Sequence, residues 1–541
     1  MQSTSSINFG VELVHLPALF VSLLSLIAVV LGPRNLGLYV RMLFGWLFGS
    51  AYNDVQPIDK SNRRSRVSDK CKCIPLYSKV FSWQLSVTPH SNYPGLRNSS
   101  GVHCFLNSTI QSLASLDSLE SFLEELLIES DKLDIYLPLS EALWDTIQAL
   151  NNPSANRAVH TNTAVINAFS LSNTSNTTHM SPSKRALSLI QSGQQDAQEM
   201  FQCISSMLAH EESLIKSAKS SVGGLGSIST PTNTTLHKNS FPLAGLTASR
   251  LADLGCGYVE AIRNIPFDAL SLNLPMQTSC NVEQLLTEYT AMETIEDASC
   301  RKCSLEATLV RLRKEVERLM PADPNSVSGS RRRKIKEAAK YERRLSSLLS
   351  EDGDLQEDAR LKDIRIDRSG GGSTKQLLIA RPPQILGLHI NRSAYLGNGM
   401  AVKNPCKIVF GELLDITSVT TTGTLETSPR KPISSASNDM LDNLTKNGTL
   451  PNRILYTLKS IVVHYGSHYS GHYVTYRKIS SDDDDDWLRT SDSSVEKVTL
   501  KHVLHENPFM IFYERVDNAS SDVDDNILNS SHILSSYSLH N

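Results

Sequence analysis

The chain has 541 residues, enough for one large domain or for two or three of ordinary size. Hydrophobic residues make up 40% and charged residues 20% of it, which suits a globular protein with a sizeable core. The net charge of −3 indicates no nucleic-acid or acidic partner. Nine cysteines, an odd number scattered over so long a chain, do not resemble a disulfide framework, so we expect reduced thiols in a cytosol-facing domain.

The N-terminal region contains the strongest targeting signal. Residues 13–31 are apolar except for one histidine, one proline and two serines, and such a run is long enough to cross a hydrocarbon core of about 30 Å. No Lys or Arg precedes Arg34, which argues against a signal peptide. Basic residues follow the run, so the positive-inside rule places the rest of the chain in the cytosol. We therefore predict a segment 1–33 with a transmembrane helix and a basic juxtamembrane linker at 34–90; a buried core helix is the alternative.

The remaining sequence is predicted to form one large domain, at residues 91–515, which four insertions interrupt. Three are rich in Ser, Thr, Asn or Gly and indicate loops, because such segments bury too little apolar area to offset the entropy lost on ordering. A fourth contains two charged amphipathic segments and predicts an inserted helical hairpin. The loops lie at 151–184, 212–240 and 417–450, the hairpin at 304–370, and a disordered tail at 516–541.

The order of the predicted elements indicates the fold class. Amphipathic helical patterns dominate the first half of the chain. Residues 375–392 and 453–478 are rich in β-branched and aromatic residues, which is typical of core strands. Helices followed by strands predict an α+β protein.

One cysteine occupies a position suited to catalysis. Cys104 follows a turn rich in Gly, Ser and Asn and begins a helix-period segment with Leu106, Ile110 and Leu113 on one face. The positive end of a helix dipole favours a thiolate there. A lone cysteine is more often a small buried hydrophobe, and a catalytic thiolate also needs a histidine base and a group that orients this base.

His472 is the candidate base. It lies in "SGHYVTY", where Gly471 allows a close backbone approach and the alternating residues after it predict a strand. Further along the chain, Ser491 or Asp492 could accept the other imidazole N–H and fix the tautomer.

Five ordered motifs resemble those of the ubiquitin-specific protease family of deubiquitinating enzymes. "GLRNSSGVHCFLNSTIQ" is similar to the cysteine box of this family and "HYGSHYSGHYVTY" to its histidine box. Between the two boxes, "QQDAQEM" and "RPPQILGLHINR" match further family motifs, and "NPFMIFYER" matches the closing strand. The matches span Gly95 to Arg515.

The resemblance implies a papain-like fold with thumb, palm and fingers, in which Cys104 is the nucleophile and His472 the general base and then acid. The implied partners are ubiquitin and ubiquitinated proteins, and catalysis is expected to need no cofactor. Gln195, Asp196, Gly471 and Tyr473 are implied to bind substrate. Asp196 also has the position of a helix N-cap, and both roles are compatible.

The third triad position departs from the family pattern. Where the family usually has Asp or Asn, this chain has Ser491, followed by Asp492. A membrane-anchored subfamily on the mitochondrial outer membrane likewise uses a Cys-His-Ser triad, so we expect Ser491 to orient His472, with Asp492 as the alternative. A hydroxyl stabilises an imidazolium less than a carboxylate does, so reduced turnover is expected.

The cysteine box contains one extra residue. The oxyanion-hole asparagine of the family lies five residues before the cysteine, where this chain has Ser99, and Asn98 lies six before it. Either the turn bulges and Asn98 still donates, or backbone N–H groups bind the oxyanion. Asn98 and Asn107 also begin formal glycosylation sequons, which have no meaning in the cytosol.

A zinc site is expected in the fingers, where many members of the family have two C-x-x-C pairs. Cys300 and Cys303 form one intact pair, whereas the other has Asp253 in place of its first cysteine and retains Cys256. Carboxylates also bind zinc, so these four residues are a candidate structural zinc site, and loss of the metal is the alternative.

These features together predict a deubiquitinase held by a single-pass anchor in the mitochondrial outer membrane or the endoplasmic reticulum, with its catalytic domain in the cytosol. One alternative is a catalytically weak or inactive ubiquitin-binding membrane tether. A peptidase that acts on a ubiquitin-like modifier is a third hypothesis.

Overall fold

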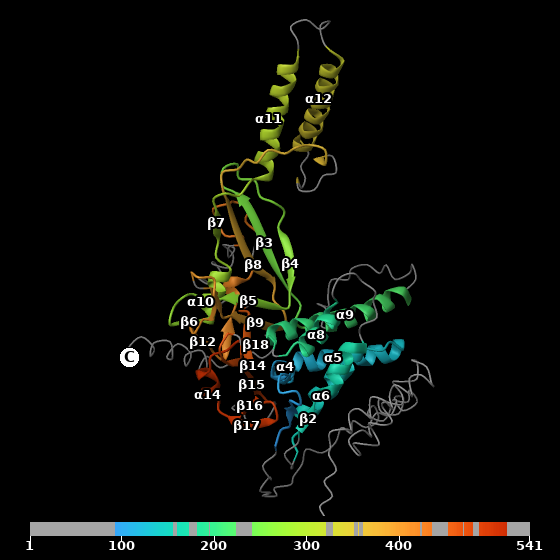
Figure 1. The fold of residues 1–541 in the computed structure, drawn as a ribbon, viewed down its shortest axis with the longest axis vertical. Helices are drawn as coiled ribbons and strands as arrows, with labels where there is room; N and C mark the ends of the chain where they lie inside the picture. The colour runs from blue at the N-terminus through green and yellow to red at the C-terminus, as the bar shows by residue number, and fades with distance from the viewer. Residues whose placement is uncertain are drawn as a thin grey trace, which may run out of the picture. The chain divides into compact units, whose positions relative to one another are not determined.

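The computed structural model of this protein describes most of the chain after residue 91 (Figure 1). The described ranges are 92–154, 159–171, 181–193, 195–222, 241–320, 328–350, 355, 361–395, 397–421, 425–434, 453–468, 470–479 and 486–516. None of the helices in these ranges combines the length and the apolar composition that spanning a membrane requires. The transmembrane helix predicted at 13–31, the linker at 34–90 and nearly all of the tail lie outside them.

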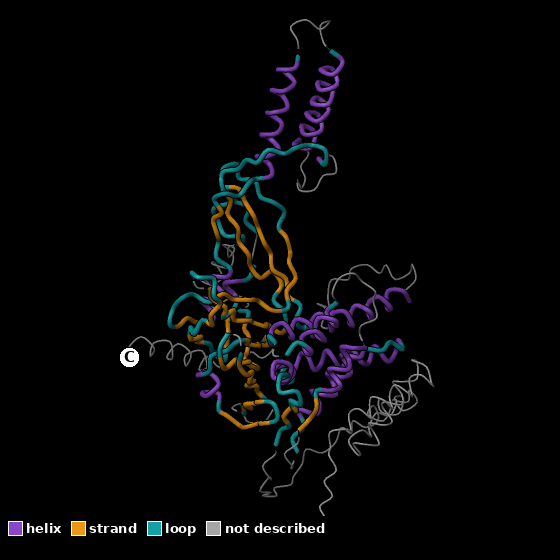
Figure 2. Tube along the Cα trace, viewed as in Figure 1, coloured by secondary structure: helices purple, strands orange, loops and turns teal. Residues whose placement is uncertain are grey.

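Helices dominate the first part of the described chain and strands the last part, which confirms the α+β class. Figure 2 shows that the helices and the strands lie largely in separate regions. The helices are α4 (Cys104–Leu113), α5 (Asp117–Leu133), α6 (Pro138–Asn151), α7 (Thr163–Leu171), α8 (Pro182–Gln191), α9 (Ala197–Val222), α10 (Val282–Tyr289), α11 (Arg301–Leu319), α12 (Gly329–Ser350) and α14 (Leu500–His505), with a 3-10 turn η6 (Thr417–Val419). The strands are β1 (Gly95–Arg97), β2 (Val159–Thr161), β3 (Gly245–Asp253), β4 (Arg263–Phe267), β5 (Ala269–Asn273), β6 (Ser279–Asn281), β7 (Glu293–Ile295), β8 (Ser373–Arg381), β9 (Ile385–Asn391), β10 (Ser393–Tyr395), β11 (Ala401–Lys403), β12 (Lys407–Val409), β13 (Leu413–Asp415), β14 (Leu455–Gly466), β15 (Gly471–Lys478), β16 (Trp487–Ser491), β17 (Ser494–Val498) and β18 (Met510–Arg515).

The largest sheet lies between two hydrophobic cores. Its strand order is β17-β16-β15-β14-β18-β9-β5, with β13 also paired to β14, and only β5 and β9 pair in parallel. Successive residues of a strand point to opposite faces, so Val462 joins the core beneath the helices while Ile461 and Val463 join the core on the other face. Burial on both faces explains why the middle of β14 is a nearly continuous apolar run.

Helices α4 to α9 form a layer on one face of this sheet, with α4 at its centre. Every residue of α4 is buried, including the polar ones. Buried polar groups need partners, and the sheet supplies them. The hydroxyl of Thr475 donates to the backbone carbonyl oxygen of Ser108 (2.8 Å). The hydroxyl of Ser460 donates to the backbone carbonyl oxygen of Ser112 (3.1 Å). These bonds fix α4 along strands β14 and β15.

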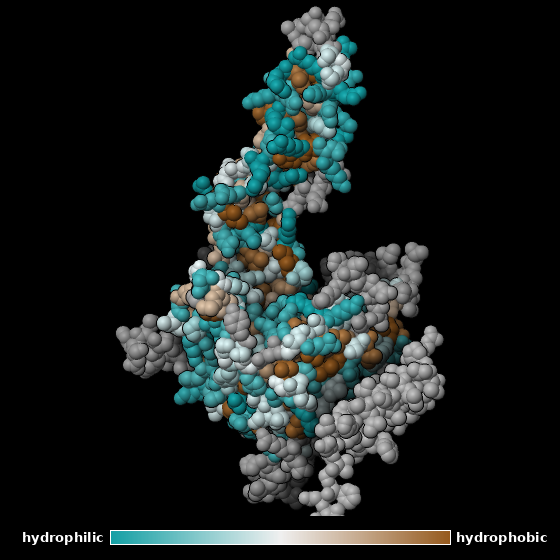
Figure 3. All heavy atoms as spheres, in the orientation of Figure 1, coloured by the Kyte–Doolittle hydropathy of each residue, from teal (hydrophilic) through white to brown (hydrophobic). Residues whose placement is uncertain are grey.

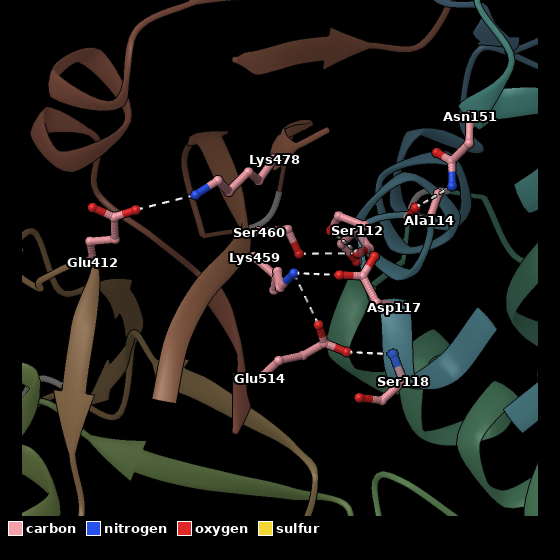
Figure 4. A network of polar contacts seen from close by, with 11 residues as sticks. Ser112, Ala114, Asp117, Ser118, Asn151, Glu412, Lys459, Ser460, Lys478 and Glu514 are labelled. Carbon is pink, nitrogen blue, oxygen red and sulfur yellow. Dashed lines mark hydrogen bonds and ion pairs between the residues drawn. The ribbon is translucent and has the colours of Figure 1, made fainter. Parts of the chain in front are cut away.

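The start of α5 is also held by the sheet, as Figure 4 shows. The buried carboxylate of Glu514 accepts a hydrogen bond from the backbone N–H of Ser118 (2.7 Å), in the first turn of this helix. Lys459 Nζ lies 3.3 Å from Glu514 Oε2 and 2.6 Å from Asp117 Oδ2. A carboxylate at a helix N-terminus is favourable, and the ammonium neutralises it. The helical layer and the sheet are therefore joined by charged groups as well as by apolar contacts.

A second sheet, with antiparallel order β4-β3-β8-β7, leads to the inserted helical hairpin. Helices α11 and α12 lie side by side (Figure 1) and enclose their own small core. Its members follow helical spacing: Leu305, Leu309 and Leu312 from α11, and Leu345 and Leu348 from α12. Figure 3 shows hydrophilic residues over most of the visible face of this hairpin, which fits the interpretation of its charges as a solvated surface.

Two segments where the sequence predicts loops are partly helical. Residues 151–184 contain β2 and α7, and α9 continues to Val222, inside the loop predicted at 212–240. Val165, Ala168 and Phe169 follow helical spacing in α7 and are buried, so this short apolar stretch forms a packed helix inside a segment whose average composition is polar. In α9, Ile215 is buried in the same core.

Candidate active site

A short turn brings the chain into α4. Gly101 has a φ of 75°, a left-handed conformation that glycine adopts without strain. The side-chain oxygen of Asn98 accepts a hydrogen bond from the backbone N–H of His103 (3.1 Å) and so spans the turn. Cys104 is the first residue of α4 and is 2% exposed. Its thiol therefore belongs to the first turn of a helix, where the dipole favours the thiolate.

His472 lies at the beginning of β15, opposite Tyr465 of β14. The residue before it has no space for a side chain, because a Cβ on Gly471 would lie 2.1 Å from the carbonyl oxygen of Tyr465 and 2.3 Å from Nε2 of His464. Glycine is thus required for the close approach of the two strands at this point. The requirement fixes the backbone immediately before the candidate base.

Cys104 lies at the N-terminal end of helix α4, and His472 lies at the N-terminal end of strand β15. Thr475 bonds to Ser108, one helical turn after Cys104, and Ser460, beside Arg477 in the sheet, bonds to Ser112. Helix and strand therefore run in the same direction, and both begin on the same side of the site. Burial raises the pKa of Tyr473, with Asp196 and Cys104 among the smaller contributions, so the residue after His472 lies within electrostatic reach of the thiol.

Ser491 contacts the candidate base directly. Its hydroxyl oxygen lies 2.9 Å from Nε2 of His472. Strand β16 delivers this hydroxyl, since it ends at Ser491 and pairs with β15. A bond at Nε2 leaves Nδ1 as the ring nitrogen that could exchange a proton with a thiol.

Asp492, the alternative orienting residue, binds the cysteine turn instead. It has a φ of 50° in the tight turn between β16 and β17. Its carboxylate accepts hydrogen bonds from Nδ2 of Asn98 (3.0 Å) and Nδ2 of Asn107 (2.8 Å), and its backbone oxygen accepts one from Leu96 (2.8 Å). The approach is so close that a Cβ on Gly95 would lie 2.6 Å from the carbonyl oxygen of Asp492.

The extra residue of the cysteine box is accommodated in this turn. Asn98 faces the turn with its oxygen and donates one amide hydrogen to Asp492, so its second amide hydrogen is the one that could bind an oxyanion. Asn107 is 1% exposed and accepts a hydrogen bond from Asn162 (2.7 Å). Its burial leaves no space for a glycan, in line with the interpretation of the sequons as meaningless.

The residues predicted to bind substrate fall into two groups. Asp196 caps α9 by accepting hydrogen bonds from the backbone N–H groups of Gln198 (2.7 Å) and Glu199 (3.4 Å), and burial raises the pKa of its carboxyl. Tyr473 is buried, and its pKa is raised first by this burial and to a smaller extent by the carboxylate of Asp196. Gln195, which is half-buried, donates to the carbonyl oxygen of Ser192 (3.3 Å), in the loop before α9. Asp196 and Tyr473 thus belong to the site, and Gln195 lies at its edge.

Two residues of the site were not predicted from the sequence, namely Asn107 and Asn162. Asn107 follows Cys104 by three residues and lies on a helix whose whole circumference is buried. A buried amide needs a hydrogen-bond partner, but half of the residues of this helix are polar, so its composition does not single out Asn107. The partners themselves lie 385 and 55 residues away along the chain, beyond the reach of local patterns.

The four predicted metal ligands come together at the junction of β3 and α11. Their ligand atoms all lie within 4.8 Å of one another. Cys256 Sγ and Cys300 Sγ are 3.5 Å apart, close to the separation of about 3.8 Å that tetrahedral zinc with bonds of 2.3 Å requires. Oδ1 of Asp253 accepts the N–H groups of Gly255 and Cys256, and Oδ2 accepts a longer bond (3.3 Å) from Gly371, which leaves Oδ2 a lone pair for a metal. The donor set fits a structural zinc ion held by three thiolates and one carboxylate.

We expect the purified full chain to contain about one zinc ion, and Cys300→Ser to lose both the ion and thermal stability, because a structural zinc stabilises the fold that positions its ligands. Elemental mass spectrometry and thermal unfolding measure the two effects. Cys280→Ser, at a buried thiol outside the cluster, is the matched control and should retain the metal. Equal zinc contents in wild type and Cys300→Ser would contradict the assignment.

Comparison with known proteins identifies the family. A model of the ubiquitin carboxyl-terminal hydrolase family matches residues 94–513. Ubiquitin carboxyl-terminal hydrolase 1 of Saccharomyces cerevisiae is 31% identical over 279 residues, which are 44% of this chain and 34% of that protein. Ubiquitin carboxyl-terminal hydrolase 27 of Arabidopsis thaliana is 25% identical and ubiquitin carboxyl-terminal hydrolase 30 of Xenopus tropicalis 23% identical. Their alignments cover 78% and 79% of this chain, and 85% and 81% of those proteins.

Among solved structures, the SAGA Ubp8/Sgf11/Sus1/Sgf73 DUB module bound to ubiquitin aldehyde contains a similar chain. The TM-score is 0.48 at 19% sequence identity, with 80% of this chain and 71% of that chain covered. The family assignment rests on the sequence match, which spans more than three quarters of the protein. The chain therefore belongs to the ubiquitin carboxyl-terminal hydrolase family of cysteine peptidases, the deubiquitinases.

Proposed function

We propose that the protein hydrolyses isopeptide and peptide bonds at the C-terminal glycine of ubiquitin, with Cys104 as nucleophile and His472 as general base and acid. The observation that carries the proposal is that α4 and β15 run in the same direction and begin on the same side of the site, so that Cys104 and His472 lie at neighbouring ends. The bond between His472 and Ser491 (2.9 Å) supports it. Nothing in the family match favours the alternative of an inactive tether.

The proposed reaction proceeds in two steps. Nδ1 of His472 takes the proton of the Cys104 thiol, and the sulfur attacks the carbonyl carbon of the glycine. The imidazolium then gives its proton to the lysine amine as the C–N bond breaks, which leaves a thioester. In the second step water gives a proton to His472 and attacks the thioester carbonyl carbon. The imidazolium then gives its proton to the sulfur as the C–S bond breaks, which restores the thiol and releases the C-terminal carboxylic acid of ubiquitin, whose proton passes to solvent.

Two further residues are proposed to act around this pair. Ser491 holds Nε2 of His472, so that Nδ1 faces the sulfur. Asp492 fixes the amide of Asn98, whose second hydrogen would bind the negative oxygen of the tetrahedral intermediate. Ser491 is thus assigned to the base and Asp492 to the oxyanion.

We expect a ubiquitin probe with a C-terminal electrophile to form a covalent adduct with the wild-type protein and none with Cys104→Ala, since the adduct requires the nucleophilic sulfur. Gel shift and mass spectrometry measure the adduct. Cys203→Ala is the control, because Cys203 is buried and its burial raises the pKa of the thiol to about 11. An undiminished adduct on Cys104→Ala, or none on the wild type, would refute the proposal.

The roles of Ser491 and Asp492 are separable with two assays. Alkylation of Cys104 by iodoacetamide reports the thiol–imidazole pair, whereas ubiquitin hydrolysis also needs the oxyanion donor. We expect Ser491→Ala to slow both, by about 10- to 100-fold, because a hydrogen bond to a charged group contributes about 1.5–3 kcal/mol. Asp492→Asn should slow hydrolysis by about 100-fold, the loss typical of an oxyanion donor, and leave alkylation nearly unchanged. Slower alkylation in Asp492→Asn than in Ser491→Ala would reverse the two assignments.

We also propose that residues 13–31 anchor the enzyme in the mitochondrial outer membrane or the endoplasmic reticulum, with the catalytic domain in the cytosol. The support is the apolar run of membrane-spanning length and the basic residues that follow it. We expect the full chain to remain in the carbonate-washed membrane pellet and a variant without residues 1–33 to become extractable. Release of the full chain by carbonate would argue against the anchor.

A further inference from the structure

One lysine joins two segments that flank the candidate base. Lys403 ends β11, the second strand of a small hairpin with β10, and pairs with Ser393. Its ammonium lies 2.6 Å from the carbonyl oxygen of His464, 3.1 Å from that of Gly466 and 3.3 Å from Nδ1 of His464. These acceptors belong to the last residues of β14, just before the chain turns back into β15. The lysine therefore binds the strand end that leads to His472.

All three acceptors are electrically neutral. Burial lowers the pKa of Lys403, and burial also lowers the pKa of His464 to about 4, so this imidazole is uncharged at neutral pH. Because Lys403 donates to Nδ1, the ring proton of His464 lies on Nε2. The cation is therefore held by carbonyl and imidazole dipoles, whose positions depend on the backbone of the turn.

The His464 ring transmits this contact to the base. Its Nε2 lies against Gly471, where a Cβ would come within 2.3 Å of it. On its other side the ring packs on Tyr473, with centroids 4.5 Å apart and planes at 31°. The residues before and after His472 thus both touch the imidazole of His464. A shift of this ring would move the start of β15.

The turn also has contacts of its own: the hydroxyl of Tyr465 donates to Glu506 (2.7 Å), and the hydroxyl oxygens of Ser467 and Ser470 lie 3.1 Å apart. Gly466 has a φ of 113°, and the turn is closed by the N–H of Ser467, which donates to the carbonyl oxygen of Ser470 (2.8 Å). Beyond His472, strand β15 is held against the helical layer by the buried side chain of Tyr473 and by the bond from Thr475 to Ser108. Lys403 is the residue that ties the turn to a neighbouring hairpin.

We propose that Lys403 is a positioning residue, which holds the β14–β15 turn through His464 and so places the His472 imidazole for proton exchange with Cys104. The inference rests on the proposed function, in which these two residues are the base and the nucleophile. Since a misplacement of about 1 Å can cost about 100-fold in rate, loss of the ammonium is expected to affect turnover more than substrate affinity.

The test compares the full-length wild-type protein with Lys403→Met and Lys403→Arg. Steady-state hydrolysis of a fluorogenic ubiquitin amide gives kcat and KM, and iodoacetamide alkylation of Cys104, mapped by peptide mass spectrometry, reports the thiol–imidazole pair without ubiquitin. The expected result for Lys403→Met is a decrease of kcat and of the alkylation rate by about 10- to 100-fold, with KM changed by less than about threefold. Lys403→Arg, which keeps the charge and the donors, should restore most of both rates.

Lys407→Met is the matched control, because Lys407 also donates to a backbone carbonyl, that of His505, and lies four residues further along the same segment. It should leave kcat, KM and alkylation unchanged. If Lys403→Met fails to fold, Lys403→Gln replaces it, since the amide retains a donor for one carbonyl without the charge.

Two outcomes would overturn the inference. A higher KM with unchanged kcat and unchanged alkylation would show that the hairpin contacts substrate, through residues such as the exposed Tyr395 and Met400, instead of positioning the base. Wild-type values in every assay would show that the contact has no role in catalysis. Absence of alkylation at Cys104 in the wild type would instead refute the proposed function, so the two failures are distinguishable.

Discussion

The site depends on the packing of a completely buried helix, α4, against the middle of the large sheet. A buried backbone carbonyl without a partner is costly, and the carbonyl groups of Ser108 and Ser112 each accept a hydroxyl from the sheet. The neighbouring helix α6 is held to the sheet as well, because the guanidinium of Arg477 donates to the carbonyl oxygen of Leu150 (2.9 Å) and the side chain of Asn151 (2.8 Å). Apolar packing alone would tolerate sliding of the helices along the strands. These bonds do not, and they fix the level at which the cysteine meets the histidine strand.

A second constraint acts on the turn that precedes α4. Leu96 and the side chains of Asn98 and Asn107 all bond to Asp492, in a turn at the far end of the sequence. The carboxylate of Asp492 is therefore committed to the cysteine side of the site, and only the neighbouring hydroxyl of Ser491 reaches the imidazole. The two adjacent residues point in different directions because Asp492 adopts a left-handed conformation at the tip of the β16–β17 turn. This geometry explains why the acidic residue does not simply replace the serine as the partner of the base.

Sequence patterns predict the proposed nucleophile and base, but not the residues that support them. Cys104 and His472 occur in short local motifs, and the α+β class follows from the periodicity of the elements around them. The network of Asn98, Asn107 and Asp492 could not be predicted, because its bonds join residues almost 400 positions apart and depend on the approach of two turns. Helix α7 differs from its prediction for another reason: six of its nine residues are apolar, but it lies inside a longer segment rich in Asn, Ser and Thr, whose average composition indicates a loop. The four candidate metal ligands are predictable because their spacing in the sequence is itself the signal.

The serine at the third position becomes understandable when both sides of the imidazole are considered. A carboxylate would orient the ring and also stabilise its charge, whereas a hydroxyl at 2.9 Å mainly orients it. Orientation is already supplied in part by the backbone, since Gly471 is pressed against His464 and Tyr473 is packed on the same ring. Because the start of β15 is held in this way, the orientation of His472 depends less on Ser491. A hydroxyl in place of a carboxylate then weakens the stabilisation of the imidazolium charge but leaves the position of the ring unchanged. The fold thus tolerates a weaker partner for His472 at the position where its neighbours already hold the strand.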